Sequence, residues 1–553
     1  MPERRVRGSA AEPDRRRRWS LHPLGLTLGV GLATLACTPT LIPRTGFFQG
    51  LVSGVMLAAG YLLGVVLARL GRRRWSRPSP TARAVGWVLL AMLLVPVVVL
   101  ALRYGYREQV AQAALLGVRP PTVAAWLLAV PVAVAVLAVL VAIVRGVRAL
   151  PRWPRRVVVG LGVVVLALAL VSIAGIPGVN PARAALDPAF AAQDAGVFGG
   201  ATQPTSPLRS GSPASALSWE SLGRGGRTFV SSGPPAAALA AASGRPAVEP
   251  IRVYVGLGSS SDAGERARLA VDELRRTGAF DRPVIAVLTT TGTGFVDAEA
   301  VDALELAWGG DTAVVTSQYS LMPSALSLLL DGDRVAAAGT TMYDAVRSAV
   351  DTLPPGRPRP RVVVFGESLG ALGSQAAFAS VDQVRDGALW NGPPNSSPLW
   401  RSLVAGRDPG TREVRPVVGN GERVRFGGGS ATPVLTTSPP APWPAPRTVY
   451  LQHPSDPVVW WSPRLLFQRP DWLAEPHGDD VLPSVRWYPL VTFWQVTMDM
   501  IRAQEVPFGH GHNYGPESLD AWMDVVPPPG WTPADTARVH AVQEAGGLPT
   551  PGA

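Results

Sequence analysis

Five long apolar stretches lie within the first 177 residues, and each is long enough to cross a lipid bilayer. They occupy residues 23–42, 46–69, 84–102, 122–144 and 157–177. An apolar helix of about 20 residues matches the thickness of the hydrocarbon core. Backbone polar groups inside a bilayer must bond to one another, which favours helices. The sequence therefore predicts an N-terminal, all-α membrane domain with five transmembrane helices over residues 23–177.

The first stretch follows a basic segment, Arg15–Arg18, as the apolar part of a signal peptide would. A signal peptide has only about 7–15 apolar residues in this region. Residues 23–42 are longer, and four further apolar stretches follow them. We therefore expect this segment to be retained as a membrane anchor.

Charge is distributed unevenly between the two parts of the chain. Residues 1–180 hold 22 Arg against four acidic residues, whereas the remainder holds 29 Arg against 36 acidic residues. The basic segments are the tail at residues 1–22 and the connections at residues 69–83 and 145–156. By the positive-inside rule these lie in the cytoplasm, so five spans place the C-terminal part outside it. The spans have almost no ionisable residue at their centres, which argues against a transporter.

The positive charge itself indicates membrane lipids as partners and not nucleic acid. The chain contains no lysine, and its N-terminal arginines gather at the ends of the apolar stretches. Such clusters are typical of topology signals and lipid-headgroup contacts. The single cysteine, Cys37, excludes an intrachain disulfide.

Residues 178–245 are rich in Pro, Ala, Gly and Ser, which is typical of a linker, here extracytoplasmic. Over residues 246–553, short β-branched runs alternate with helical patterns. This alternation predicts a mostly parallel, doubly wound sheet. Residues 393–446 are rich in Pro and Gly, and we expect a lid or insertion there with a hairpin at residues 413–426. The predicted strands are residues 251–255, 283–288, 312–316, 361–365, 386–390 and 447–452.

The strand at residues 361–365 runs directly into Gly366-Glu-Ser-Leu-Gly370, and a helical pattern follows. A G-x-S-x-G sequence between a strand and a helix is typical of a sharp turn that exposes a nucleophilic serine, here Ser368. Gly366 and Gly370 leave room for the strand and the helix to pass closely. The backbone amide of Leu369, at the start of the helix, can then face a developing oxyanion.

A serine nucleophile needs a base, and the base needs an acid to orient it. His510 and His512 lie in a glycine-rich loop after the last predicted strand, so either can reach across the end of the sheet. The alternatives for this loop are a plain turn or a weak metal site. Asp456, directly after the strand at residues 447–452, is the candidate acid, with turn capping as its alternative role.

The second oxyanion donor is expected in the loop after a strand that flanks the serine strand. Thr291, Gly292 and Thr293 fit this position, and residues 256–260 are the rival loop. Both loops are alternatively plain turns. The rival loop lacks the third glycine of a dinucleotide-binding loop, which disfavours that function.

Five motifs of the chain are Gly366-Glu-Ser-Leu-Gly370, Thr291-Gly-Thr-Gly294, Gln318-Tyr-Ser320, Trp390-Asn-Gly-Pro-Pro394 and Gly509-His-Gly-His512. Together they resemble a family of actinobacterial membrane proteins. These proteins pair a multi-span N-terminal domain with a C-terminal α/β-hydrolase domain that is predicted to carry a Ser-Asp-His triad. The resemblance implies cleavage of ester or amide bonds by Ser368, Asp456 and one of the two histidines, and we expect no cofactor or metal. An aromatic residue two positions after His512 favours that histidine.

The leading hypothesis is a membrane-anchored serine hydrolase that acts on the ester of a lipid or of an acylated cell-envelope component. The membrane tether and the tryptophans of the C-terminal part favour a lipid, although tryptophans also fill protein cores. The alternatives are acyl transfer by the same triad, and a non-catalytic binding or scaffold protein that keeps the hydrolase shell. The tryptophans are Trp390, Trp400, Trp443, Trp460, Trp461 and Trp472.

Overall fold

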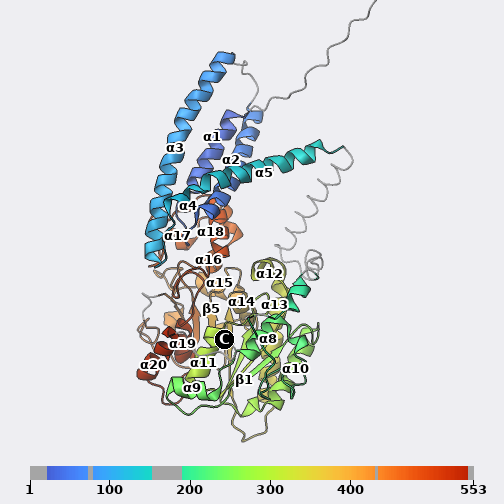
Figure 1. The fold of residues 1–553 in the computed structure, drawn as a ribbon. Coiled ribbons are helices and arrows are strands. Elements are labelled where there is room, and N and C mark those ends of the chain that lie inside the picture. The colour runs from blue at the N-terminus through green and yellow to red at the C-terminus, as the bar shows by residue number, and fades with distance from the viewer. Residues whose placement is uncertain are drawn as a thin grey trace, which may run out of the picture.

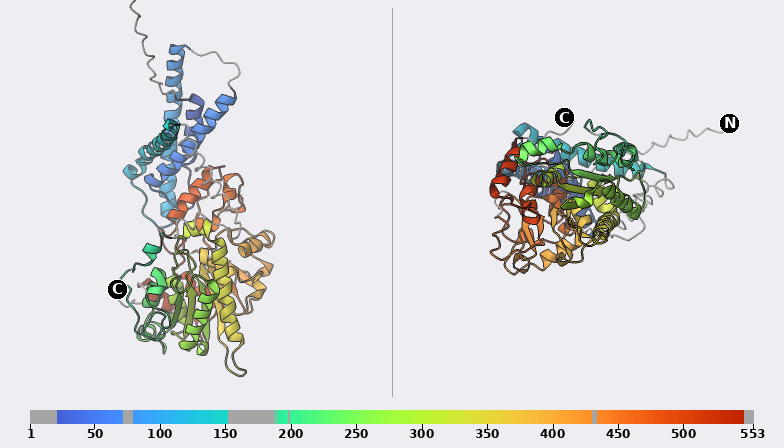
Figure 2. Two further views of the ribbon diagram at one scale, coloured as in Figure 1. Left: turned by 90° about the vertical axis from the view of Figure 1, so that its right-hand side faces the viewer. Right: turned by 90° about the horizontal axis from the view of Figure 1, so that it is seen from below.

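The computed structural model describes residues 21–71, 79–151, 188, 190–197, 199–429 and 434–545. The chain forms a bundle of long helices and an α/β domain, stacked end to end (Figure 1). The side view in Figure 2 shows the same arrangement, with the segment around α18 (Val491–Ile501) between the two parts.

The N-terminal part consists of α1 Pro23–Leu35, α2 Gly46–Leu70, α3 Pro80–Leu115, α4 Val123–Leu127 and α5 Ala129–Ala149. Among the described residues, three segments are long and apolar enough to cross a membrane: Gly46–Leu70, Pro80–Leu115 and Val123–Ala149. This agrees with the second, third and fourth predicted spans.

Within the part of the chain that the structure describes, three candidate spans therefore replace the first four of the five predicted transmembrane helices. Residues 23–42 do not form a full span, because α1 has only 13 residues. Pro39 and Pro43 follow it, and proline cannot continue a helix. The loop after α1 is buried within the protein, so its apolar character reflects protein contacts and not lipid. The fifth predicted span, residues 157–177, lies outside the described residues.

Glycines allow α2 to approach its neighbours closely. A Cβ atom at Gly60 would lie 2.4 Å from the carbonyl oxygen of Leu28 in α1. A Cβ atom at Gly50 would lie 2.5 Å from Cβ of Val132 in α5. Small residues at helix interfaces are the usual way in which membrane helices gain van der Waals contact.

The C-terminal part contains a seven-stranded sheet with the order β1-β3-β2-β4-β5-β7-β6. All six strand pairs are parallel. The β-branched runs that predicted the strands are buried along the centre of the sheet. The predicted parallel α/β sheet is thus confirmed. The strands are β1 Ile251–Val255, β2 Val284–Thr289, β3 Thr312–Ser317, β4 Arg361–Glu367, β5 Ala388–Asn391, β6 Val424–Gly427 and β7 Thr448–Leu451.

Helices cover both faces of this sheet (Figure 1). On one face α10 packs beside α13, and on the other α11 packs beside α19. The helices are α8 Gly223–Ser231, α9 Ala236–Ser243, α10 Ala263–Arg276, α11 Ala298–Ala307, α12 Ser324–Leu330, α13 Gly332–Asp351, α14 Leu369–Gln375, α15 Pro398–Ala405, α16 Pro457–Trp460, α17 Asp471–Ala474, α18 Val491–Ile501, α19 Glu517–Val525 and α20 Pro533–Glu544. Single 3-10 turns are η1 Glu220–Leu222, η2 Ala279–Asp281, η3 Val381–Gln383, η4 Gly419–Gly421 and η5 Pro463–Leu466.

Two segments differ from the expected pattern. The predicted hairpin at residues 413–426 is instead an edge strand, β6, which pairs in parallel with β7. Residues 223–243, within the segment expected to be a linker, form α8 and α9, and α8 packs on β1.

The helix α18 joins the two parts of the molecule. Val491 at its start shares a buried cluster with Val52 of α2. The Asp499 carboxylate accepts hydrogen bonds from the backbone amides of Leu41 (3.1 Å) and Ile42 (3.4 Å). The loop between α1 and α2 is thus covered by the α/β domain.

Candidate active site

Ser368 lies at the turn between β4 and α14. Its backbone has φ 55° and ψ −126°, a region that non-glycine residues rarely occupy. This geometry is that of the sharp strand-to-helix turn that exposes a nucleophilic serine. The elbow predicted from the sequence is present in the structure.

The two glycines of the elbow have no room for a side chain. A Cβ atom at Gly366 would lie 2.3 Å from the carbonyl oxygen of Gly370. A Cβ atom at Gly370 would lie 2.2 Å from the carbonyl oxygen of Thr289, at the end of β2. Strand, helix and neighbouring strand therefore meet at van der Waals distance around Ser368.

Asp456 and His512, which are 56 residues apart, form a buried pair. The His512 Nδ1 atom lies 2.7 Å from the Asp456 Oδ2 atom. Asp456 caps the N-terminus of α16, where its other oxygen accepts a hydrogen bond from the amide of Val458 at 2.8 Å. The hydroxyl of Tyr514 donates to Asp456 Oδ2 at 2.6 Å. The carboxylate is fully buried and fixed by three donors, so it can orient the imidazole through Nδ1.

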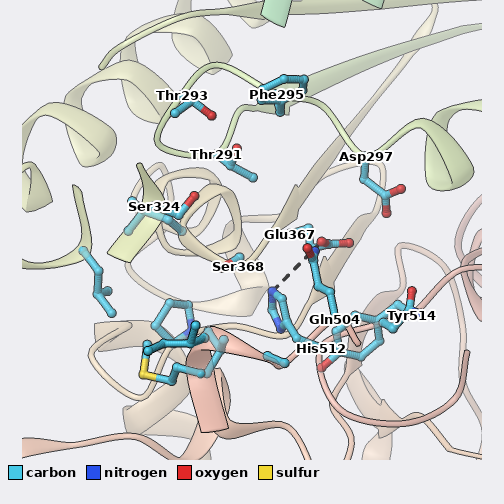
Figure 3. A pocket seen from close by; sticks show the side chains of 18 of the residues that line it. Thr291, Thr293, Phe295, Asp297, Ser324, Glu367, Ser368, Gln504, His512 and Tyr514 are labelled. Atoms are coloured by element: carbon cyan, nitrogen blue, oxygen red, sulfur yellow. Dashed lines mark ion pairs between the residues drawn. The ribbon is translucent and has the colours of Figure 1, made fainter. Parts of the chain in front are cut away.

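Backbone contacts bring the His512 ring next to the serine turn. The amide of Ser368 donates to the carbonyl of Asn391 at 2.9 Å. A Cβ atom on the next residue, Gly392, would lie 2.4 Å from His512 Cε1. Ser368 and His512 line the same pocket, and Figure 3 shows them beside each other. The Nε2 atom of His512 has no hydrogen-bond partner among the described residues, although the ring is only 5% exposed.

The other imidazoles near this loop have different partners. His510 lies 3.2 Å from Asp480, and it does not line the pocket of Ser368. His453 is bonded to the carbonyl of Gly511 and to Glu517. Of the two histidines that the sequence left open, the structure brings His512 to Asp456 and Ser368.

Three of the four expected oxyanion residues line the same pocket, whereas Gly292 is not among the residues that line it. Thr291, Thr293 and Leu369 line the pocket, and the loop of the two threonines follows β2, the strand beside β4. The amide of Thr291 already donates to the Phe295 carbonyl, and that of Gly292 to the Ser324 hydroxyl. The rival loop, residues 256–260, follows β1, which β3 and β2 separate from β4.

A carboxyl cluster next to His512 was not found by sequence reasoning. Glu367 precedes the serine, and its Oε1 atom lies 4.0 Å from His512 Nε2. Burial, together with the charges of Glu299 and Asp456, raises the pKa of Glu367 to about 7. Burial and the neighbouring Glu367 likewise raise the pKa of Asp297 well above its usual range, and burial raises the pKa of Glu299 to about 7. The only sequence signal was an acid at the first variable position of the motif.

The pocket around these groups has a volume of about 960 Å³. This is at the upper end of the range for small-molecule sites. Figure 3 shows Ser368, Glu367 and His512 grouped at its centre, with Thr291 and Thr293 across from them. Within the described part of the chain, no group of three or more His, Cys, Asp or Glu residues is arranged to hold a metal ion.

Family models match both parts of the chain. Residues 251–539 match an alpha/beta-hydrolase family, and residues 37–234 match the N-terminal region of an alpha/beta-hydrolase family. The chain belongs to this alpha/beta-hydrolase family. Comparison with curated proteins and with solved structures gives no match. Membership in an alpha/beta-hydrolase family supports a hydrolase-type activity in general.

Of the six tryptophans noted in this member of the alpha/beta-hydrolase family, five are core residues. Trp461 is only partly buried and lines the pocket. The tryptophans therefore add little to the case for a lipid substrate. The buried five are Trp390, Trp400, Trp443, Trp460 and Trp472.

Proposed function

We propose that this alpha/beta-hydrolase is a membrane-anchored, extracytoplasmic serine hydrolase that cleaves an ester of a lipid or acylated envelope component through an acyl-enzyme on Ser368. The observation that carries the proposal is the buried Asp456–His512 pair, 2.7 Å apart, in the pocket of Ser368. The unpartnered His512 Nε2 atom is the one that must accept the serine proton.

In the first half-reaction, His512 takes the proton of the Ser368 hydroxyl as its oxygen attacks the ester carbonyl carbon. The tetrahedral intermediate collapses, the alcohol leaves with the proton from His512, and the acyl group stays on Ser368. Water then attacks the acyl-enzyme with His512 again as base, which releases the acid and regenerates the serine. Asp456 stabilises the imidazolium in both steps.

The oxyanion is stabilised by the amide of Leu369, in the first turn of α14. The helix amides of Ala371 and Leu372 bond to the carbonyl of Ser368, whereas the first amides of a helix have no intrahelical acceptor. The hydroxyls of Thr291 and Thr293, which line the pocket, supply further donors.

The test uses full-length protein in detergent and a fluorophosphonate probe, which reacts with activated serines. The wild type is labelled, and Ser368→Ala is not. His512→Ala lowers the turnover of a p-nitrophenyl ester about 10⁴-fold or more, as expected for the loss of a triad base. Product analysis with an added alcohol separates hydrolysis from acyl transfer by the same triad.

His510→Ala is the matched control, because it removes an imidazole from the same loop but not from the pocket. We expect less than a tenfold change for this variant. Equal labelling of Ser368→Ala and the wild type would show that the nucleophile is not Ser368. A larger loss for His510→Ala than for His512→Ala would show that the base is wrongly assigned.

A further inference from the structure

The helix α18 presents two faces with different surroundings. Val491 and Asp499 face the membrane part, where they contact α2 and the loop after α1. Thr497, Met500 and Ile501 instead line the pocket of Ser368. This division follows helical spacing, since residues four or eight apart share a face. One helix therefore separates the pocket from the membrane helices.

The edge of the apolar region can be located on α3. Nine of its eleven large exposed apolar side chains lie between Val85 and Leu100, and the polar Arg103 follows; Tyr104 and Leu115 lie beyond it. Two residues after Arg103, a Cβ atom at Gly105 would lie 2.7 Å from the carbonyl oxygen of Cys37. Cys37 Sγ in turn lies 3.7 Å from the side-chain amide of Gln49 on α2. Gln49 of α2 therefore lies at the same depth as Gly105 of α3, at the edge of the apolar region nearest the α/β domain.

The first half of α18 lies deeper than this edge. Val491 belongs to a buried cluster with Val52 and Met56 of α2, and Trp494 packs against the cluster. Met56 is seven residues beyond Gln49, which corresponds to about 10 Å along a helix. This half of α18 is therefore at the depth of lipid acyl chains.

Apolar side chains line the pocket next to α18. Val458, Trp461 and Met500 lie there, and the Trp461 Nε1 atom donates to Thr497 of α18 at 2.9 Å. Ile501, at the end of α18, lines the pocket and is 62% exposed. The second half of α18, which continues from the half at acyl-chain depth, thus contributes apolar side chains to the pocket of Ser368.

Apart from His512 and a tyrosine, the ionisable side chains that line the pocket are all carboxylic acids. Carboxyl groups occur at Asp297, Glu299, Glu367 and Glu505, and no arginine is among the described residues that line the pocket. An anionic headgroup would lose its hydration there without gaining a cation, which is costly. Hydroxyl groups can donate hydrogen bonds to the carboxylates.

We propose that the substrate is an acyl ester of a membrane lipid with an uncharged, hydroxyl-bearing headgroup, and that its acyl chain enters the pocket from the bilayer alongside α18. This inference rests on the proposed function, because it takes Ser368 as the nucleophile. The scissile carbonyl then lies between the apolar α18 side and the carboxyl cluster.

The experiment uses full-length protein reconstituted in vesicles of ether-linked phosphatidylcholine, which has no ester to cleave. Three substrates are compared: dioleoylglycerol and dioleoylphosphatidic acid within the vesicles, and methylumbelliferyl acetate in the buffer. We expect dioleoylglycerol to be cleaved at least tenfold faster than dioleoylphosphatidic acid.

Ile501→Arg places a charge on the entry route. It should lower the ratio of dioleoylglycerol to methylumbelliferyl acetate turnover at least tenfold. The matched control is Val248→Arg. Val248 is an exposed aliphatic residue that precedes the edge strand β1, and it does not line the pocket. This control should leave the ratio as in the wild type.

The outcomes separate this inference from the proposed function. Fluorophosphonate labelling and acetate turnover that persist, with an unchanged ratio in Ile501→Arg, would overturn entry along α18 and leave the serine hydrolase standing. Equal rates for the two lipid headgroups would overturn the headgroup preference. A wild-type protein that shows neither fluorophosphonate labelling nor turnover of any of the three substrates would overturn both proposals.

Discussion

Gly392→Ala tests the position of the catalytic imidazole. The substituted Cβ atom would lie 2.4 Å from His512 Cε1, 2.7 Å from Nδ1 and 2.8 Å from the Tyr514 ring. Ordinary contact begins at 3.4 Å, so the ring must move by about 1 Å. A displacement of this size in a catalytic group costs about 100-fold in rate. We therefore expect kcat for a soluble ester to fall about 100-fold.

The substitution also strains the backbone, because Gly392 has φ 51°. A side chain in this left-handed region costs about 1–2 kcal/mol of stability. Gly278→Ala separates the two effects, since Gly278 has φ 73° but no atom within 4 Å of its Cβ position. It should lose similar stability and keep its kcat.

The assay is turnover of p-nitrophenyl acetate, with active sites counted by fluorophosphonate and stability followed by thermal unfolding. A kcat for Gly392→Ala within threefold of that for Gly278→Ala would refute the reasoning. The imidazole beside residue 392 would then not be the base.

Two further changes probe the groups around the triad. Tyr514→Phe removes the 2.6 Å hydrogen bond to the Asp456 carboxylate. Because such a bond is worth about 1.5–3 kcal/mol, kcat should fall about tenfold or more. A kcat that stays within twofold of the wild-type value would contradict this role of Tyr514. The pKa of Glu367 is raised from its ordinary 4.5 to about 7, so the folded state binds more protons than the unfolded state between these values. This contribution to stability is complete below pH 4.5 and is lost as the pH rises through 7. The unfolding midpoint of Glu367→Gln, measured relative to that of the wild type, should therefore be higher at pH 8 than at pH 5. A midpoint difference that does not depend on pH would contradict the raised pKa of Glu367.

Much of the sheet could be predicted from the sequence because its strands are buried on both faces. Such strands are continuous β-branched runs, and Val362, Val363 and Val364 are nearly fully buried in β4. The edge strand β6 was predicted as half of a hairpin, since it has only four residues. Its pairing with β7 depends on contacts with residues more than 20 positions away, which local patterns do not encode.

The number of spans could not be read from hydropathy alone. Leu41 and Ile42 are fully buried within the protein. In a bilayer-spanning helix, lipid would cover such apolar side chains instead. Apolar composition records burial without saying what provides it. The prolines at positions 39 and 43 were the signal that α1 ends early.

The elbow at Ser368 was predictable because glycine positions and a strand–helix context constrain it. The preference for His512 over His510 had only the aromatic Tyr514 behind it, since both histidines lie in one glycine-rich loop. The carboxyl contact between Glu367 and Asp297 joins residues 70 positions apart, and only the fold brings them together. Such contacts between distant segments are beyond a reading of local sequence.

The membrane part also supports the histidine loop itself. The amide of His512 donates to the carbonyl of Ala503, which follows α18, at 2.8 Å. The Ile42 side chain, from the loop after α1, lies 3.1 Å from the Cβ position of Gly511. The loop after α1 is also bonded to α18, because the backbone amides of Leu41 and Ile42 donate to the Asp499 carboxylate. Because the imidazole must be held within a fraction of an ångström, a segment that packs against its loop contributes to the geometry of the site. The N-terminal part therefore helps to hold the geometry of the candidate active site.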